Sequence, residues 1–143
     1  MQKFCQDRVV IITGAGGGLG AAHARVLASH GAKVVINDIN QAAAEQVVQE
    51  IVSSGGEAVY NNVNITDFAD SKRSVDQAIS EFGALHAVVN NAGNNRDRMF
   101  ASLSEEDWDA VISVHLKGHF CTSRHAVQYW RCLLYTSPSP RDR

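Results

Sequence analysis

Short apolar runs alternate with amphipathic segments along most of the chain, and this alternation predicts its secondary structure. The run Arg8–Ile12 is continuous and β-branched, as in a strand that is buried on both faces. Further strands are predicted at 32–37, 57–63 and 85–90, and helices at 19–30, 40–54, 66–82 and 104–131. Strands that alternate with helices predict an α/β fold with a doubly wound parallel sheet.

The predicted helices have recognisable faces and ends. Ser104 and Asp107 have the spacing of a capping box and predict the start of the long helix. Thr66 is the predicted start of the third helix, and Gly83 is its predicted end. The expected inward positions of the third helix are Phe68, Val75, Ile79 and Phe82. Those of the first helix are Ala22, Val26 and Leu27.

A glycine-rich loop, Thr13–Gly20, joins the first strand to the first helix. A strand, a glycine loop and a helix in this order direct free backbone N–H groups and a helix N-terminus at a diphosphate. Glycine lets a phosphate approach the backbone and tolerates a turn with positive φ. The predicted phosphate-binding residues are Gly14, Gly16, Gly17, Gly18, Leu19 and Gly20.

An acid, Asp38, follows the second strand about 20 residues after the loop, where a carboxylate takes the ribose hydroxyls of a dinucleotide. An isolated aspartate would be interpreted as a turn or helix-cap residue, but the position at a strand end after a phosphate loop favours ribose binding. The carboxylate would repel a 2′-phosphate, and no basic residue stands at Gly17 or Ile39 to offset this. The predicted cofactor is therefore NAD.

Two polar corners end the third and fourth strands, at the edge where open α/β sheets bind ligands. Asn62 and Val63 close the third predicted strand, and Asn90–Gly93 closes the fourth. In the second corner the amide side chains are expected to tie neighbouring strands together, while Ala92 and Gly93 leave room for a flat ring. An ordinary Asx/Gly turn remains the alternative.

Length, charge and cysteine content limit the class of protein but identify no further functional residue. The 143 residues suit one domain, and a net charge of −2 gives no reason to expect a nucleic-acid or membrane partner. Cys5 and Cys121 suggest no disulfide framework. The chain has no long apolar run and no signal-peptide core, so the expected location is cytoplasmic, with peroxisomal import left open.

The last dozen residues depart from the pattern. Residues 132–143 contain both prolines and match the translation of a common sequencing-library adapter. A native Pro/Ser-rich linker is the alternative. We therefore expect residues 1–131 to be an incomplete NAD-binding domain, truncated after the fourth strand and the long helix, and residues 132–143 to be foreign to it.

Together the motifs Thr13–Gly20, Asp38 and Asn90–Gly93 resemble those of the short-chain dehydrogenase/reductase family, over residues 6–131. The resemblance implies a Rossmann fold and an NAD(P)-dependent oxidoreductase that is dimeric or tetrameric. It implies that Asp38 holds the adenosine ribose. It also implies cofactor contacts from Asn62, Val63, Asn91, Ala92 and Gly93.

Within the family, segments 94–100 and 108–120 are similar to the 3-hydroxyacyl-CoA dehydrogenase branch, which includes part of the peroxisomal multifunctional β-oxidation enzyme. This implies a 3-hydroxyacyl thioester as the small-molecule substrate. Two alternatives stay open: a 3-oxoacyl thioester reductase of fatty-acid synthesis, and a non-catalytic dinucleotide-binding module. Arg96 and Arg98 are candidates for CoA phosphates or for ordinary ion pairs.

Two departures from the family pattern concern catalysis. His115 stands where the family usually has a proton-relay asparagine, and it is either a polar substitute or a packed histidine. His115 and His119 lack the further ligands of a zinc site, so no metal is expected. The resemblance also implies a catalytic tyrosine, a lysine four residues after it and a serine that orients the substrate, but no Tyr-x-x-x-Lys occurs in the 143 residues, and all three groups are expected beyond Arg131. We therefore expect this chain alone to be inactive.

Overall fold

A computed structural model describes residues 2–136. Its four strands form one parallel sheet in the order β3-β2-β1-β4. The strands are β1 (Val9–Thr13), β2 (Lys33–Asn37), β3 (Glu57–Asn61) and β4 (Ala87–Val89). The helices are α1 (Gly18–Ser29), α2 (Gln41–Ser53), α3 (Phe68–Phe82), η1 (Phe100–Ser102), α4 (Glu105–Ile112), η2 (Ser113–Gly118) and α5 (His119–Thr136). The predicted doubly wound α/β architecture is confirmed.

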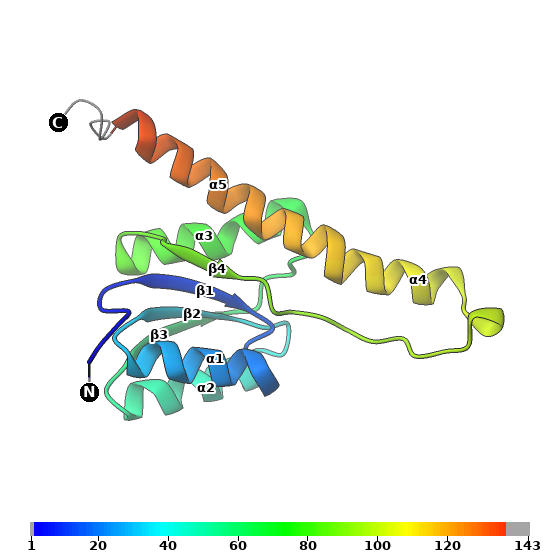
Figure 1. The fold of residues 1–143 in the computed structure, drawn as a ribbon, viewed down its shortest axis with the longest axis horizontal. Helices are drawn as coiled ribbons and strands as arrows, with labels where there is room; N and C mark the ends of the chain where they lie inside the picture. Colours follow the sequence, from blue (N-terminus) through cyan, green and yellow to red (C-terminus); the bar gives the residue numbers. More distant parts are fainter. Residues whose placement is uncertain (1, 137–143) are drawn as a thin grey trace.

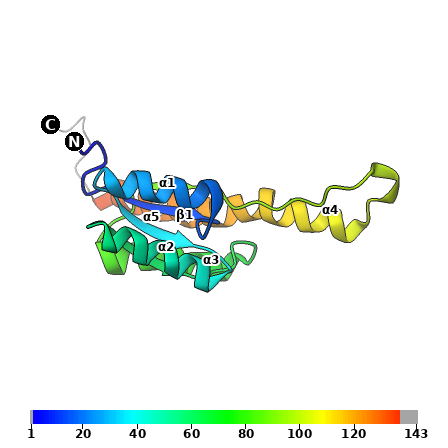
Figure 2. The ribbon, with the colours of Figure 1, turned by 90° about the horizontal axis from the view of Figure 1, so that it is seen from below.

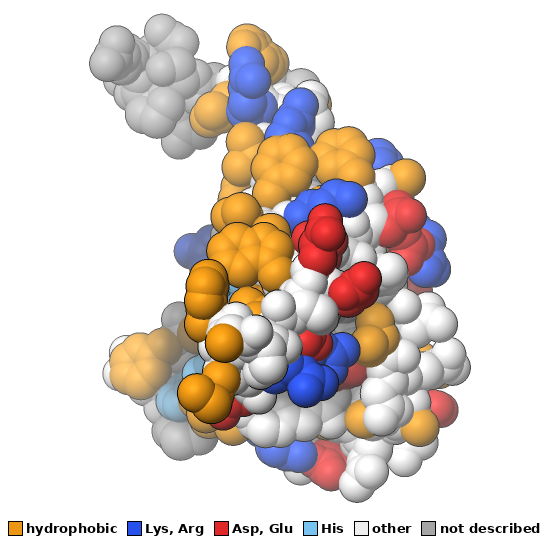
Figure 3. Space-filling model, turned by 90° about the vertical axis from the view of Figure 1, so that its right-hand side faces the viewer, with side chains coloured by type: hydrophobic (Ala, Val, Ile, Leu, Met, Phe, Trp, Pro, Cys, Tyr) orange, Lys and Arg blue, Asp and Glu red, His pale blue; other side chains and the backbone are white. Residues whose placement is uncertain are grey.

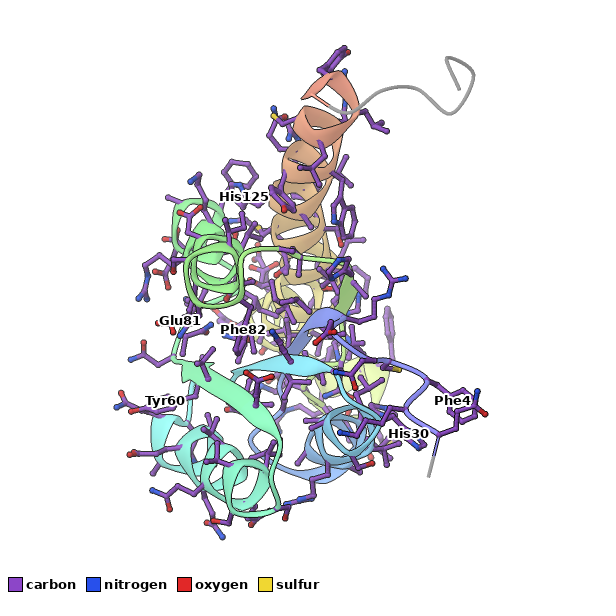
Figure 4. All side chains as sticks on the ribbon, turned by 90° about the vertical axis from the view of Figure 1, so that its left-hand side faces the viewer. Phe4, His30, Tyr60, Glu81, Phe82 and His125 are labelled. Atoms are coloured by element: carbon purple, nitrogen blue, oxygen red, sulfur yellow. The ribbon has the colours of Figure 1, made fainter. Side chains whose placement is uncertain are left out.

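The sheet is covered on both faces (Figure 1), which explains why every residue of β1 is buried and why all but Thr13 are apolar. Successive β1 side chains enter opposite layers. Val10 and Ile12 pack between the sheet and helices α1 and α2. Val9 and Ile11 pack on the opposite face, between the sheet and helices α3 and α5. Phe82 points from α3 toward the strands (Figure 4). The two crossover directions diverge at β1, so the crevice for a ligand lies beyond its carboxyl end.

The buried face of α1 differs from the predicted one at two of three positions: Leu27 is half-buried and packs against the core as predicted, but Ala22 and Val26 do not. Val26 is 58% exposed, and Ala22 is also exposed. Three alanines face the sheet instead, because small side chains allow the helix to lie close to the strands. They are Ala21, Ala24 and Ala28.

The start of α3 also differs from the prediction. Asp67 is the N-cap in place of Thr66, and its side chain accepts a hydrogen bond from the N–H of Asp70. Phe68 is 44% exposed rather than buried. Its ring stacks on Phe120 and contacts His125, and these contacts join α3 to α5. Figure 4 shows His125 beside both helices.

The long predicted helix is present, but it is not uniform. The capping box of Ser104 and Asp107 is confirmed at its start. One π-helical turn, η2, interrupts it between α4 and α5, and α5 continues past the predicted end to Thr136. Residues 137–143, most of the segment expected to be foreign, lie outside the described residues. Figure 2 shows that α4 and the loop before it project beyond the sheet. No helix among residues 2–136 is long and apolar enough to cross a membrane.

Candidate cofactor-binding site

The glycine loop leaves the N-terminus of α1 uncapped. Gly17 is the N-cap in an extended conformation, and no side chain accepts a hydrogen bond from the first turn, which also carries no acid. A Cβ added at Gly17 or Gly18 would have no heavy atom within 4 Å. Free N–H groups beside open space are what an anion at a helix N-terminus requires. Leu19, which follows them, is 74% exposed.

The other loop glycines are constrained by their neighbours. A Cβ at Gly14 would lie 2.7 Å from the backbone of Ala92, and Gly14 also has a positive φ of 62°. A Cβ at Gly20 would lie 2.5 Å from the side-chain nitrogen of Asn91 and 2.6 Å from the carbonyl oxygen of Gly14. These glycines therefore pack the loop, α1 and the Asn-Asn-Ala-Gly corner into one unit.

Asp38 is fastened to the glycine loop. Its Oδ2 accepts a hydrogen bond from the backbone N–H of Gly16 at 2.9 Å, and its Oδ1 accepts one from the N–H of Asn40 at 2.9 Å. A Cβ at Gly16 would meet the carboxylate at 2.8 Å. The sequence predicted an acid near a bound ribose but gave no sign of this bond, because it joins residues 22 positions apart.

The Asn-Asn-Ala-Gly corner ties the strands as predicted. The side-chain amide of Asn91 donates to the carbonyl oxygens of Thr13 at 3.0 Å and Gly14 at 3.2 Å. The hydroxyl oxygen of Thr13 accepts from the backbone N–H groups of Asn91 and Ala92 at 3.1 and 3.0 Å. The amide of Asn90 reaches α5, where it donates to the hydroxyl of Ser123 at 2.9 Å.

A buried asparagine that the sequence analysis missed organises the end of β3. The amide of Asn37 donates to Asn61 Oδ1 at 2.8 Å and to the carbonyl oxygen of Val63 at 2.9 Å. Val63 is thereby held in the interior, at the predicted adenine side of the site. The sequence signal that could have identified Asn37 is its position as a polar residue at the end of the apolar run Val34–Ile36.

These elements enclose a cleft of about 380 Å³ at the carboxyl edge of the sheet. Six predicted site residues line it: Gly14, Asp38, Val63, Asn91, Ala92 and Gly93. Asn62 does not line it, but is exposed in a neighbouring groove near Gln41. Asn37, Ile39, Asn64, Ile65, Thr66, Asn94 and Val114 complete the lining.

His115, which stands where the family usually has a proton-relay asparagine, lies in η2 and contacts the backbone next to Gly93. Nε2 of His115 lies 2.8 Å from the carbonyl oxygen and 3.1 Å from the nitrogen of Asn94. The ring of His119 lies 6.4 Å from that of His115, and its Nε2 lies 3.4 Å from the carbonyl oxygen of Ala92. Residues 2–136 contain no group of side chains that could hold a metal ion.

Of the two arginines in the projecting loop, Arg96 and Arg98, Arg98 already has an acidic partner. Its guanidinium forms an ion pair with Asp107 at 2.8 Å. The hydrogen bond from Ser104 lowers the pKa of Asp107, and the positive charges of Arg98 and Arg96 lower it further. Arg98 therefore takes the ordinary ion-pair role that the sequence analysis kept open.

Comparisons with known proteins agree with this architecture. The model of the short chain dehydrogenase family matches residues 8–133. A solved short chain dehydrogenase from Mycobacterium avium superposes with a TM-score of 0.90 and 50% identity, over 93% of this chain and 49% of that one.

Two curated relatives carry names that mention hydroxyacyl or peroxisomal chemistry. The hydroxyacyl-CoA dehydrogenase ChsB1 of Mycobacterium tuberculosis is 44% identical over 128 residues, covering 87% of this chain and 40% of that protein. The peroxisomal hydratase-dehydrogenase-epimerase of Saccharomyces cerevisiae is 44% identical over 135 residues, 88% of this chain and 15% of that protein. The chain spans half or less of the length of these proteins. By its fold, its motifs and these matches, the chain belongs to the short-chain dehydrogenase family.

Proposed function

We propose that this chain is the NAD-binding part of an oxidoreductase that oxidises a 3-hydroxyacyl thioester to its 3-oxo form. One observation carries the cofactor proposal: Gly14 of the glycine loop, Asp38 and the Asn-Asn-Ala-Gly corner line one cleft, and Gly16 of the loop is bonded to Asp38. The open space at Gly17 and Gly18 fits a group that approaches the backbone as closely as a diphosphate does.

Each part of the cofactor has a candidate partner in the chain. The free N–H groups at the start of α1 would hold the diphosphate, and Asp38 would accept from the hydroxyls of the adenosine ribose. Val63 would flank the adenine, while Asn91 to Gly93 would approach the nicotinamide ribose. NAD would supply the hydride acceptor, and the protein would supply its orientation.

The preference for NAD over NADP rests on charge. Asp38 is half-buried and bonded to the loop, so it cannot swing away from a 2′-phosphate without losing two hydrogen bonds. Ile39 is exposed beside it and offers no positive charge. A carboxylate with no compensating cation favours the cofactor that has a free hydroxyl.

The substrate proposal rests on the relatives named for hydroxyacyl-CoA and peroxisomal enzymes, and on the similarity of segments 94–100 and 108–120. The family's tyrosine and lysine are not in the chain. We therefore propose that the 143-residue chain binds cofactor without turnover and that the parent protein, extended past residue 131, carries the proton-transfer groups.

The test of this function uses the parent protein expressed from the uninterrupted reading frame. We expect reduction of NAD⁺ in the presence of a 3-hydroxyacyl-CoA, followed at 340 nm. Turnover of 3-oxoacyl carrier protein with NADPH, and none with 3-hydroxyacyl-CoA, would favour the reductase alternative. Cofactor binding without turnover of either substrate would favour the non-catalytic module.

We further propose that the parent is a dimer or tetramer that pairs through the long helix. Figure 3 shows hydrophobic side chains gathered in a band on one face, and Trp108, Leu116 and Phe120 are exposed along the helix. The helix begins with acids and continues with bases, so antiparallel pairing would bring opposite charges together. The molar mass of the parent in solution, measured by light scattering, tests this.

Two proposals concern the extent and location of the protein. We propose that residues 1–131 are native and that 132–143 are foreign, which the genomic reading frame decides. We keep the cytoplasmic location as a proposal for the parent. The peroxisomal name of the yeast relative makes import into peroxisomes the alternative outcome when a tagged parent is imaged in cells.

A further inference from the structure

The π-helical turn η2 brings the ring of His115 onto the backbone of the corner. A Cβ added at Gly93 would lie 2.6 Å from Cε1 and 3.1 Å from Nε2 of His115, and its three nearest heavy atoms all belong to this ring. Gly93 is not among the glycines with positive φ, so its backbone conformation does not itself require glycine. The ring of His115 is therefore what excludes a side chain at position 93.

His115 also contacts Asn94, the residue that follows the corner. Its Nε2 is within hydrogen-bond distance of both backbone groups of Asn94, so either tautomer of the ring keeps a bond there. Asn94 lines the cleft, and its side-chain nitrogen donates to the carbonyl oxygen of Ala110 at 3.1 Å. Its Oδ1 is buried and has no hydrogen-bond partner among the described residues. A buried acceptor without a donor costs stability unless a ligand or water supplies one.

We propose that His115 is a positioning residue: it lies on Gly93 and fixes Asn94 so that Asn94 Oδ1 accepts from a hydroxyl or amide of the nicotinamide half of the cofactor. This inference rests on the proposed NAD site and deepens it. In this proposal His115 orients Asn94 by packing and hydrogen bonding, and it does not take the proton-relay role considered from the sequence. The adenosine half, held by the glycine loop and Asp38, does not depend on His115.

The test is a double-mutant cycle between His115→Ala and Gly93→Ala, read by calorimetric titration with NADH and, separately, with AMP. His115→Ala should weaken NADH roughly tenfold and leave AMP unchanged, because AMP lacks the nicotinamide half. Gly93→Ala alone should weaken NADH by a similar factor. In the double variant, the added methyl meets no ring, so the loss should be no greater than with His115→Ala alone.

Conservative and matched variants separate positioning from a general structural role. His115→Gln, whose amide reaches the same backbone groups, should restore most of the NADH affinity. His23→Ala removes an exposed histidine of α1 and should change neither titration. Thermal melting provides the same cycle without a ligand. Gly93→Ala should lower Tm when His115 is present, but should not lower it further when His115→Ala has already removed the ring.

The outcomes distinguish this inference from the function on which it rests. If the unchanged chain binds NADH and AMP, but the two substitutions have additive effects or weaken both ligands equally, the positioning role is wrong and the cofactor site stands. If the folded chain binds neither ligand, the proposed function fails, and this inference fails with it.

Discussion

The charge of Asp38 is the sharpest determinant of cofactor choice that the structure offers. Replacing Asp38 with Asn removes the charge and keeps one acceptor oxygen for either Gly16 or Asn40, which both donate to the carboxylate at 2.9 Å. Asn cannot serve both with one oxygen, so some loss of stability is expected. Because NADH and NADPH both bind the same loop, this loss cancels when their affinities are compared as a ratio.

The size of the effect follows from Coulomb's law. Two unit charges about 4 Å apart repel by about 4 kcal/mol at an effective dielectric constant near 20, and a 2′-phosphate bound against Asp38 would meet a repulsion of this order. Asp38 is half-buried, and solvent screening reduces this to about 2 kcal/mol, which corresponds to roughly thirty-fold in affinity. We expect the chain to prefer NADH by at least this factor.

The assay is a pair of titrations that follow the fluorescence of NADH and NADPH, with the chain and its Asp38→Asn variant. The preference should fall by about thirty-fold in the variant. Glu81→Gln is the matched control, because it removes an equal charge from the exposed surface of α3, outside the cleft (Figure 4). A ratio that stays within twofold of the original in Asp38→Asn would refute the role given to this carboxylate.

Three further predictions concern the fold around the site. Gly20→Ala should destabilise the chain by about 1–3 kcal/mol, because its Cβ would lie 2.5 Å from a side-chain nitrogen; Gly17→Ser, which points into open space and supplies an N-cap, should melt no lower than the original. Val26→Lys should reduce light scattering at unchanged Tm, because Val26 lines an apolar groove beside the unpaired edge of β4; equal scattering would contradict this. The lowered pKa of Asp107 means that its carboxylate stabilises the folded state above its unfolded pKa, and that this contribution is lost as pH falls through the lower folded value. The start of α4 should therefore stay ordered to lower pH than an aspartate with the ordinary pKa would allow, as amide chemical shifts would show, and Asp107→Asn should reduce that pH dependence.

The sequence predicted those features that depend on short-range patterns. Each strand was located to within a few residues because its β-branched run is bounded by polar or glycine residues. The capping box at Ser104 was identified correctly because its two partners are three residues apart. The sequence predicted that the amides of the corner bond a neighbouring strand, since parallel strands bring their carboxyl ends to one edge, but it did not name Thr13 as the partner of Asn91.

The features that were missed depend on packing between distant segments. The predicted face of α1 was right for Leu27 but wrong for Val26, because hydrophobicity favours Val26 whereas close approach to the sheet requires alanine. A single π turn shifts the helix by one residue and leaves no clear trace in periodicity, so η2 and the position of His115 over Gly93 were not foreseen. The hydrogen bond from Gly16 to Asp38 was also not foreseen, because it joins residues 22 positions apart and depends on how the loop packs against the end of β2.

The central claim, that this chain carries a dinucleotide site at its glycine loop, is tested most directly by titrating the folded 143-residue chain with NADH. We predict saturable binding at one site per chain that AMP displaces. Gly17→Ser should weaken this binding without lowering Tm, because the added hydroxyl occupies the space and the N–H groups offered to the diphosphate. A chain with a cooperative thermal transition that binds no NADH would contradict the account.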